Sequence, residues 1–227
     1  MAEIKQKRVI VAIDGPAGAG KSTIAKRLAD RLGFTYIDTG AMYRAVALAG
    51  MRSGVDWDRP EQLAELAEKL DIRMDGQRTM LGDEDVSEAV RSLEVTAVTR
   101  YAADNPRVRQ RLVQLQRAIA GTDDIVTEGR DQGTVVFPDA ACKIFLTASA
   151  EERARRRWND LRARDETVSL EDILAAQRRR DHEDASRAVG PLLPAADAVK
   201  VVTDGLSEDA VVNLLESLAR GKYGKIT

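Results

Sequence analysis

Cysteine and histidine are almost absent from this sequence of 227 residues, which contains one of each. A single cysteine excludes an internal disulfide framework and fits a reducing compartment. Because Cys142 lies in the apolar run 142–146, we expect a buried thiol rather than a nucleophile. The only histidine is His182, and one histidine with one cysteine cannot build a zinc site or a histidine-based acid–base constellation. Any chemistry must therefore come from other residue types.

The sequence also lacks an excess of charge of either sign and any long apolar run. Its 35 basic residues nearly balance its 37 acidic residues, so the net charge is −2. No overall field draws such a chain to nucleic acid or to a membrane. The apolar stretch 9–13 is too short for the hydrophobic region of a signal peptide, and no segment approaches the length that spans a bilayer. We therefore expect a cytoplasmic monomer that binds neither nucleic acid nor membrane.

The rest of the composition, with 44% apolar and 32% charged residues, is ordinary for a globular enzyme, and the length suits one domain with room for an inserted piece. Short β-branched runs alternate with longer helical patterns. Strands are predicted at 8–13, 34–37, 124–127, 143–147 and 199–203. Helices are predicted at about 21–32, at 41–52 and after Ser207, which would cap the last one. This alternation predicts an α/β fold with a parallel five-stranded sheet flanked by helices.

Residues 54–103 depart from this alternation. Pro60 introduces a predicted helix, and short candidate strands follow near 71–74, 79–81 and 85–86. Two turn-forming pairs separate the strands, Asp75-Gly76 and Gly82-Asp83. We interpret the region as a small α+β insertion, at about 60–103, with an antiparallel hairpin or three-stranded sheet. The alternative is an extended decorative loop.

A glycine-rich segment joins the first predicted strand to the first predicted helix. It fills every fixed position of the P-loop pattern, with Gly15, Pro16, Ala17, Gly18, Ala19, Gly20, Lys21 and Ser22, followed by Thr23. Glycines let backbone N–H groups converge on phosphate oxygens, and the start of a helix adds partial positive charge. Lys21 would reach the β- and γ-phosphates of ATP, and the Ser22 hydroxyl would ligate Mg²⁺. The segment predicts a P-loop three-layer fold that binds a nucleoside triphosphate; the alternative is a glycine-rich turn with no ligand.

The arginines separate a kinase from other P-loop proteins. Arg44 lies on the helix after the second strand, and Arg130 and Asp131 directly follow the third strand. Because the carboxyl ends of parallel strands form the ligand crevice, we expect these residues to face the P-loop. Two anionic ligands side by side need fixed positive charge, and arginine binds phosphate bidentately. This pattern favours a kinase.

Two further groups of charged residues lie in later helical patterns. Arg180, Asp184 and Arg187 are spaced i, i+4 and i+7, which predicts one helical face. The other group begins the helix after the fourth strand, with Arg153, Arg156 and Arg157. Arginine-rich helices such as 151–164 are also commonly solvated faces with weak ion pairs, so both interpretations stay open for each arginine there.

Several polar residues have simpler explanations. Either Asp38 or Thr39 could cap the second helix. Arg78, Arg91 and Arg100 have no partner that the sequence can assign, and we interpret them as surface charge.

Four stretches together resemble the bacterial cytidylate kinase family. They are 13–23, 38–44, 129–140 and 187–197, with the sequences IDGPAGAGKST, DTGAMYR, GRDQGTVVFPDA and RAVGPLLPAAD. They fall in the family's order and span nearly the whole chain. Many families share the P-loop, whereas the third stretch is much more restrictive. The family also has an enlarged insertion on its monophosphate-binding side, in agreement with the segment 60–103. The resemblance implies a single P-loop kinase domain over 1–227, with ATP, CMP or dCMP and Mg²⁺ as its ligands.

The resemblance implies a role for each matched residue. Arg44, Arg130 and Arg187 occupy the positions that grip the CMP phosphate and the transferring group, and with the P-loop lysine they would be the catalytic residues. Arg180 and Asp184 resemble the pair that binds the pentose.

Base recognition and a mobile lid are implied in the same way. Thr39, Arg109 and Asp131 occupy positions associated with the cytosine ring, and a lid at about 151–167 would bring Arg153, Arg156 and Arg157 over ATP. The sequence departs from the family twice. The family often has Ser at Thr39 and Met at Gln132, and the second change makes the surroundings of Asp131 more polar.

Two other functions stay open at this point. The nearer is a P-loop kinase for another small acceptor, such as a different nucleotide or an alcohol like shikimate. The more distant is a non-enzymatic, ATP-sensing P-loop protein, which would not need Arg44, Arg130, Arg180 and Arg187 to converge beside the P-loop.

Overall fold

The computed structural model describes residues 8–76, 78–163 and 167–223. The described residues form two compact units. The first comprises the chain up to Thr35 and from Thr122 onward, and the second is Tyr36–Gly121. Each unit is presented by itself.

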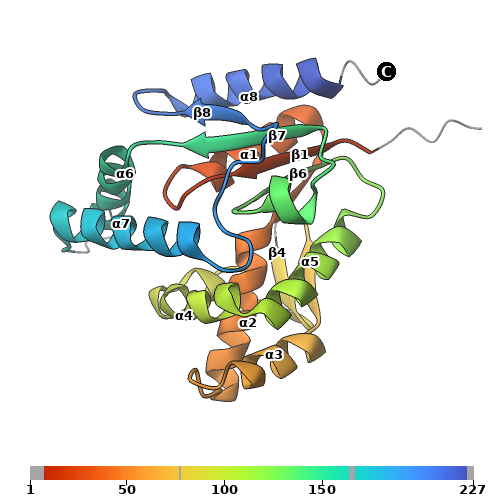
Figure 1. Cartoon of the computed structure of the whole chain (residues 1–227), viewed down its shortest axis with the longest axis vertical. Helices are drawn as coiled ribbons and strands as arrows, with labels where there is room; N and C mark the ends of the chain where they lie inside the picture. The colour runs from red at the N-terminus through yellow and green to blue at the C-terminus, as the bar shows by residue number, and fades with distance from the viewer. Residues whose placement is uncertain (1–7, 77, 164–166, 224–227) are drawn as a thin grey trace, which may run out of the picture. The chain divides into compact units, whose positions relative to one another are not determined.

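Four strands of a five-stranded parallel sheet belong to the first unit, and the edge strand β2 begins at its residue Thr35 and continues into the second unit (Figure 1). The strand order is β2-β6-β1-β7-β8, and the strands are β1 Ile10–Asp14, β2 Thr35–Asp38, β6 Ile125–Gly129, β7 Cys142–Thr147 and β8 Val199–Val202. Strand β1 pairs in parallel with β6 and β7, and β7 pairs in parallel with β8. All five residues of β1 are buried, and β1 is the central strand of the sheet. The segment that follows Asp14 therefore begins at the middle of the sheet. The α/β fold with a five-stranded sheet is confirmed.

The predicted strand bounds differ from the observed ones by at most two residues. β1 ends at Asp14 instead of 13, and β6 runs on to Gly129 instead of stopping at 127. Glu128 and Gly129 pair with Ile13 and Asp14 of β1 inside the ladder. Pairing with a neighbouring strand, which is not a local property, sets these bounds.

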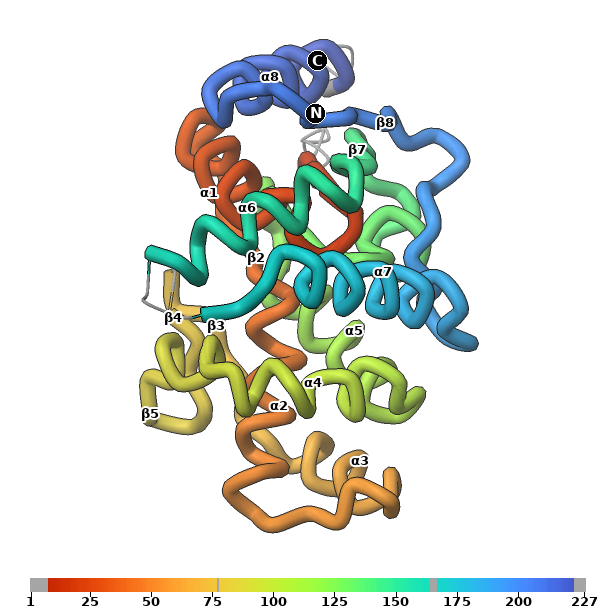
Figure 2. Tube along the Cα trace, turned by 90° about the vertical axis from the view of Figure 1, so that its left-hand side faces the viewer, coloured from red at the N-terminus to blue at the C-terminus, as the bar shows by residue number. Residues whose placement is uncertain are grey.

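The helices of the first unit are α1 Lys21–Leu32, α6 Ala150–Arg162, α7 Leu170–Ser186 and α8 Glu208–Tyr223, with a π-helical turn η2 at Gln132–Val136. Helix α1 ends as predicted at Gly33, whose N–H bonds to the carbonyls of Ala29 and Asp30. Helices α1 and α8 lie side by side, and α8 also packs on β7 (Figure 1). Helices α6 and α7 pack against each other (Figure 2). Ser207 caps α8 as predicted, accepting from the Ala210 N–H.

The second unit combines helices with a small antiparallel sheet. Its elements are α2 Thr39–Ser53, α3 Pro60–Lys69, β3 Ile72–Asp75, β4 Arg78–Leu81, β5 Glu84–Asp85, a 3₁₀ turn η1 Ala89–Arg91, α4 Leu93–Asp104 and α5 Pro106–Ala120. The sheet order is β3-β4-β5, so the predicted three-stranded sheet is confirmed and the decorative loop is not found. Gly76 and Gly82 occupy its turns with φ of 60° and 59°.

This unit is wider than the predicted insertion 60–103. Its core joins residues from α2 to α5, among them Met42, Leu63 and Leu112. Helix α2 packs on α4, and α3 packs on α5, so apolar faces outside 60–103 are buried in the same core. The monophosphate-binding role of segment 60–103 stays a prediction.

Cys142 is buried in β7, as expected. Burial raises the pKa of its thiol to about 11, so the thiol stays protonated at neutral pH. Among the described residues, no helix has both the length and the apolar character needed to cross a membrane.

Candidate active site

The P-loop connects β1 to α1, and its glycines allow two close contacts. At Gly15, where φ is 155°, a Cβ atom would lie 1.9 Å from the carbonyl oxygen of Leu146. At Gly18, where φ is 78°, a Cβ atom would lie 2.8 Å from the side-chain nitrogen of Gln177 on α7. The backbone carbonyl of Leu146 leaves no room for a side chain at Gly15, and at Gly18 the positive φ favours glycine, so the fold needs these residues beyond phosphate binding.

Lys21 lies at the start of α1 and is 5% exposed. Its Nζ donates to the carbonyl oxygen of Pro16 at 2.9 Å, within the P-loop. Burial lowers the pKa of this lysine, and Arg130 lowers it further, against the opposing effect of Glu128 and Asp14. An anion beside Nζ would offset the cost of burying this charge, which is the environment expected of a phosphate-binding lysine.

Two carboxylates beside the P-loop were missed at the level of the sequence. Glu128, at the end of β6, accepts a 2.8 Å hydrogen bond from the Ser22 hydroxyl. Asp14, at the end of β1, accepts from the backbone N–H groups of Gln132 and Gly133. Both are acidic residues at the carboxyl ends of buried strands, and this position was the signal that could have identified them.

A charged group at the end of α7 collects three of the predicted site residues. Asp184 accepts from Arg130 Nε and from an Arg187 terminal nitrogen, both at 2.8 Å. Burial alone would raise the pKa of Asp184, but the two arginines outweigh it and hold this pKa below its usual range. One buried carboxylate therefore orients two arginines, and the group keeps a net positive charge.

The prediction that Arg180, Asp184 and Arg187 share one helical face was wrong for Arg187. Helix α7 ends at Ser186, and Arg187 has an extended backbone with φ of −59° and ψ of 132°. Its side chain still reaches Asp184, three residues back. Arg180 lies on α7 with an exposed side chain, and its charge contributes to the lowered pKa of Lys21.

The arginines assigned to the lid differ from one another. Arg153 is buried and binds within the protein, to the carbonyls of Ala17 and Ala148 at 3.0 Å and to both carboxylate oxygens of Asp181. Arg153 thus fixes the P-loop to α7, a role that the sequence did not suggest. Arg157 is half-buried on α6, and residues 164–166 of the predicted lid lie outside the described residues.

Surface ion pairs, the alternative for these helices, are present as well. Arg155 and Arg156 both pair with Glu152, and Arg178 pairs with Glu151. Arg156 also donates to the carbonyl oxygen of Thr203 at 2.9 Å.

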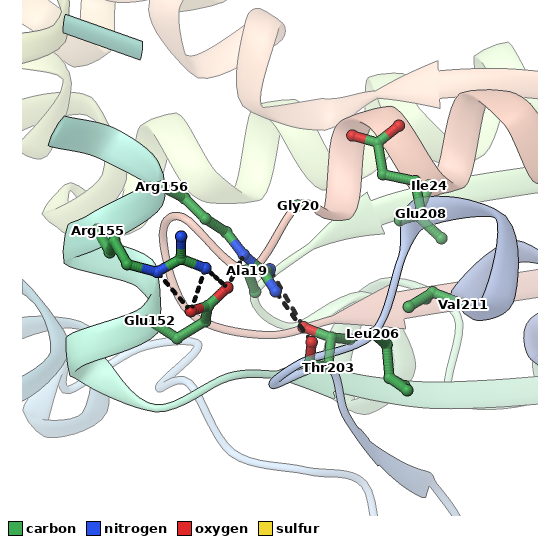
Figure 3. Close-up of a pocket in the computed structure, with 10 residues that line it drawn as sticks. All are labelled: Ala19, Gly20, Ile24, Glu152, Arg155, Arg156, Thr203, Leu206, Glu208 and Val211. Atoms are coloured by element: carbon green, nitrogen blue, oxygen red, sulfur yellow. Dashed lines mark hydrogen bonds and ion pairs between the residues drawn. The ribbon is translucent and has the colours of Figure 1, made fainter. Parts of the chain in front are cut away.

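A pocket of about 240 Å³ lies beside the P-loop (Figure 3). It is lined by Ala19, Gly20, Ile24, Glu152, Arg155, Arg156, Thr203, Leu206, Glu208 and Val211. Arg156 extends across it toward Thr203 (Figure 3). Ile24, Leu206 and Val211 contribute apolar side chains to its wall, and Glu152, Arg155 and Glu208 contribute charged ones. A guanidinium facing apolar groups can hold a flat aromatic ring.

The second unit holds another arginine pair, on Asp38. Asp38 caps α2 by accepting from the Ala41 N–H at 2.8 Å, so Asp38 rather than Thr39 is the cap. Arg44 lies 3.4 Å from both carboxylate oxygens of Asp38, and Arg91 lies 3.3 Å from one of them. Arg91 lies on the surface as interpreted, with its side chain 62% exposed, and the structure supplies the partner that the sequence could not assign. Arg44 Nε is buried and has no hydrogen-bond partner among the described residues, which leaves a donor for an anion.

The remaining predicted residues of this unit are buried. Thr39 lies in the first turn of α2, and Arg109, which is 4% exposed, lies on α5. The guanidinium of Arg109 donates to the carbonyl oxygen of Ala103 at 3.2 Å and lies 5.7 Å from the ring centroid of Tyr43.

Arg78 and Arg100 have partners on the exposed surface. Arg78 pairs with Asp75, and Arg100 bonds to the hydroxyl of Tyr101. Nothing in these contacts connects either arginine with the candidate site.

Comparison with known proteins gives the same family from several directions. The model of the cytidylate kinase family matches residues 11–220. A cytidylate kinase of Rhodopirellula baltica is 55% identical over 203 residues, covering 89% of each chain. A cytidylate kinase of Desulfitobacterium hafniense is 48% identical over 220 residues, covering 96% of this chain and 95% of its own. Among solved structures, an uncharacterized protein from Eubacterium ventriosum has a TM-score of 0.51 at 14% identity, covering 95% of this chain and 99% of its own. That last likeness concerns the fold alone.

Proposed function

This chain belongs to the cytidylate kinase family, and on that premise we propose that it transfers the γ-phosphoryl group of ATP to CMP or dCMP, giving CDP or dCDP. The observation that carries the proposal is the group of cations at the end of α7 and the P-loop. Lys21, Arg130 and Arg187 are gathered in the first unit with Asp184 as the carboxylate that the two arginines share. Such a group suits two phosphates that must approach each other.

ATP would bind through the P-loop and the adjoining pocket. Backbone N–H groups and Lys21 would hold its phosphates, with the start of α1 adding positive potential. The adenine ring would occupy the pocket of Figure 3, between Ile24 and the guanidinium of Arg156. Of the three lid arginines, Arg156 and Arg157 are the candidates for contact with ATP, because Arg153 is bound to Ala17 and Asp181.

The residues beside the P-loop also fit a magnesium ion. Ser22 offers a hydroxyl oxygen, and the carboxylate of Glu128 accepts the proton of that hydroxyl, which leaves the oxygen lone pairs for a cation. Within the described residues no group of three or more acidic, histidine or cysteine side chains could hold a metal alone, so phosphate oxygens would complete the coordination. When bound, Mg²⁺ supplies neutralisation of the charge on the transferring phosphates.

The resemblance to the family assigns each part of CMP to particular residues of this chain. The CMP phosphate is assigned to Arg44, Arg130 and Arg187, and Arg91, which shares Asp38 with Arg44, is a further candidate within the second unit. The ribose is assigned to Arg180 and Asp184, and the cytosine to Thr39, Arg109 and Asp131. Gln132, where the family often has Met, has a hydrogen-bond partner inside the protein: its side-chain oxygen accepts a 2.9 Å hydrogen bond from the buried Thr127 hydroxyl.

The reaction needs no general base. A phosphate monoester has a second pKa near 6, about one unit below neutral pH, so the CMP phosphate is mostly a dianion. One of its oxygens attacks the γ-phosphorus. The bond from the γ-phosphorus to the oxygen that bridges the β- and γ-phosphates breaks, and that oxygen leaves as part of ADP. Lys21 and the arginines stabilise the charge that spreads over the transferring group. The near absence of histidine and cysteine is therefore compatible with the chemistry.

A substrate panel tests this function directly. With ATP as donor and ADP release as the readout, we expect CMP and dCMP to be converted well, and UMP, AMP, GMP and shikimate poorly. A purified protein that phosphorylates another member of the panel better than CMP would refute the assignment. A protein that binds ATP without releasing ADP, whatever the acceptor, would instead favour the ATP-sensing alternative.

The substitution Asp131→Asn tests how cytosine is distinguished from uracil. Cytosine presents an amino donor where uracil presents a carbonyl acceptor, and a carboxylate can only accept. The amide of asparagine adds a donor that can turn toward uracil. Since a good pair of this kind is worth roughly 1–3 kcal/mol, we expect the ratio of kcat/KM for CMP to that for UMP to narrow at least several-fold. The KM for ATP should change little.

Asp131 has a purely structural alternative, in which it only holds the neighbouring Arg130. That arginine already pairs with Asp184. If kcat/KM fell equally for CMP and UMP, Asp131 would have no part in reading the base.

A further inference from the structure

Asp14 is a buried carboxylate that no step of the proposed mechanism uses. It is the last residue of β1, in the middle of the sheet, and is 4% exposed. Its two oxygens accept from two successive backbone N–H groups, those of Gln132 and Gly133, each at 2.8 Å. The next residue of the chain is Gly15, the first of the P-loop. One side chain therefore joins the base of the P-loop to the loop after β6.

The loop after β6 depends on this contact for its conformation. Its turn η2 begins at Gln132, and the first N–H groups of a helical turn have no partner inside the turn. Asp131 stands at the capping position but makes no side-chain cap hydrogen bond. Asp14 supplies the missing acceptors from 118 and 119 residues away in the sequence. A distant residue thus does the capping, and the Asp131 carboxylate is not used for it.

The contact is also sterically tight. A Cβ atom on Gly133 would lie 3.2 Å from the Lys143 side chain and 3.4 Å from an Asp14 oxygen, so the loop has little room to shift. Lys143 holds the far end of the same loop by donating to the Pro138 carbonyl oxygen. Arg130 and Asp131 lie directly before the two clamped N–H groups.

Burial disfavours the ionised form of the Asp14 carboxylate. Burial raises the pKa of Asp14 to about 6, the two backbone hydrogen bonds lower it, and the charge of Asp131 raises it. Lys21 faces it as well and favours the ionised form. At neutral pH Asp14 is therefore mostly ionised and accepts both N–H groups, whereas protonation removes one of the two acceptors.

We propose that Asp14 is a positioning residue for phosphoryl transfer, which holds Arg130 and Asp131 at a fixed place relative to the P-loop by clamping the N–H groups of Gln132 and Gly133. The proposal rests on the proposed function, because it gives Arg130 and Asp131 their contacts with CMP. It adds a residue that acts through the backbone and touches no substrate.

The test compares the wild-type protein with Asp14→Asn. The asparagine keeps one acceptor and turns an NH₂ group toward the other N–H, so the loop must move. Because a misplacement of about 1 Å can cost about 100-fold, we expect kcat/KM for CMP to fall roughly 10- to 100-fold. The ratio of kcat/KM for CMP to kcat/KM for UMP should narrow. Amide hydrogen exchange at Gln132 and Gly133 should become faster, while exchange in α1 stays unchanged.

Thr127→Val is the matched control. It removes a buried hydrogen bond to the Gln132 side chain but leaves the backbone clamp in place. We expect a less stable protein whose CMP-to-UMP ratio stays within about twofold of the wild type. If Asp14→Asn behaves like this control, with unchanged exchange at Gln132 and Gly133, the positioning role is wrong.

A measurement on the wild type alone keeps the proposal testable if the variant does not fold. The phosphates of CMP and UMP titrate alike, so the ratio of their kcat/KM values cancels that effect. As the pH falls from 7.5 to 5.5, Asp14 takes up a proton and the ratio should narrow; a constant ratio would overturn the proposal. A wild-type protein without CMP kinase activity would overturn the proposed function instead, and exchange at Gln132 and Gly133 would still report on the clamp.

Discussion

Replacing Lys21 with alanine is expected to lower kcat by roughly 10²- to 10³-fold, because it removes a charge whose contact strengthens as the γ-phosphoryl group is transferred. The fold should survive. Lys21 is buried with a lowered pKa, so its ammonium group costs stability in the absence of a ligand, and alanine removes that cost. The measurement is steady-state kinetics with CMP and ATP, together with thermal unfolding.

Lys26→Ala is the matched control for this change. Lys26 lies on the same helix, but its side chain is exposed, so we expect kcat close to the wild-type value. A Lys21→Ala protein with near-normal kcat would end the interpretation of this chain as a P-loop kinase.

Replacing Asp184 with asparagine is expected to have the second largest effect, a fall in kcat of roughly 10²-fold. The sequence and its resemblance suggest an effect on nucleotide KM through the ribose. The structure adds a larger consequence, because Arg130 and Arg187 both bind this carboxylate and would lose their common partner. Breaking a buried ion pair from one side costs about 3–5 kcal/mol, so the free energy of unfolding should fall as well.

Comparison of CMP with dCMP separates the two roles of Asp184. If it binds the 2′-hydroxyl, Asp184→Asn should weaken CMP more than dCMP, in addition to the common fall in kcat. Equal losses for the two nucleotides would leave only the role of orienting the arginines. Glu183→Gln is the control, since Glu183 is the exposed neighbour on the same helix and should leave kcat unchanged.

Arg187→Ala removes one of the two arginines that Asp184 orients. Asp184→Asn, Arg187→Ala and the double variant form a double-mutant cycle. Because Asp184 and Arg187 are in contact, the effects of the two single changes on kcat should not be additive.

Local patterns were enough to predict the elements on which the site is built. The helix Lys21–Leu32 was predicted with its observed bounds, because the P-loop precedes it and Gly33, with φ of 71°, ends it. The turn glycines Gly76 and Gly82 likewise marked the small sheet. Strand ends were less predictable, since Gly129 belongs to β6 only through its pairing with Asp14 of β1.

Partners far apart in the sequence were not predictable in this way. An arginine on a polar helix face has the same local pattern whether it is solvated, binds substrate or holds the protein together. Arg153 was assigned to ATP, yet its partners are Ala17 and Asp181. Arg91 had no partner that the sequence could assign, and it binds Asp38, 53 residues away.

By itself, the sequence determined the P-loop, the alternation of strands and helices and the family. These depend on residues that are neighbours in the chain, on glycine's access to positive φ and on the period of apolar residues. Only the tertiary structure decided which charges meet. It brought Arg130 to Asp184 across 54 residues and Gln132 to Asp14 across 118. The physical reason is that a buried charge must find a partner to offset its loss of water, and folding, not sequence distance, determines which partner lies within reach.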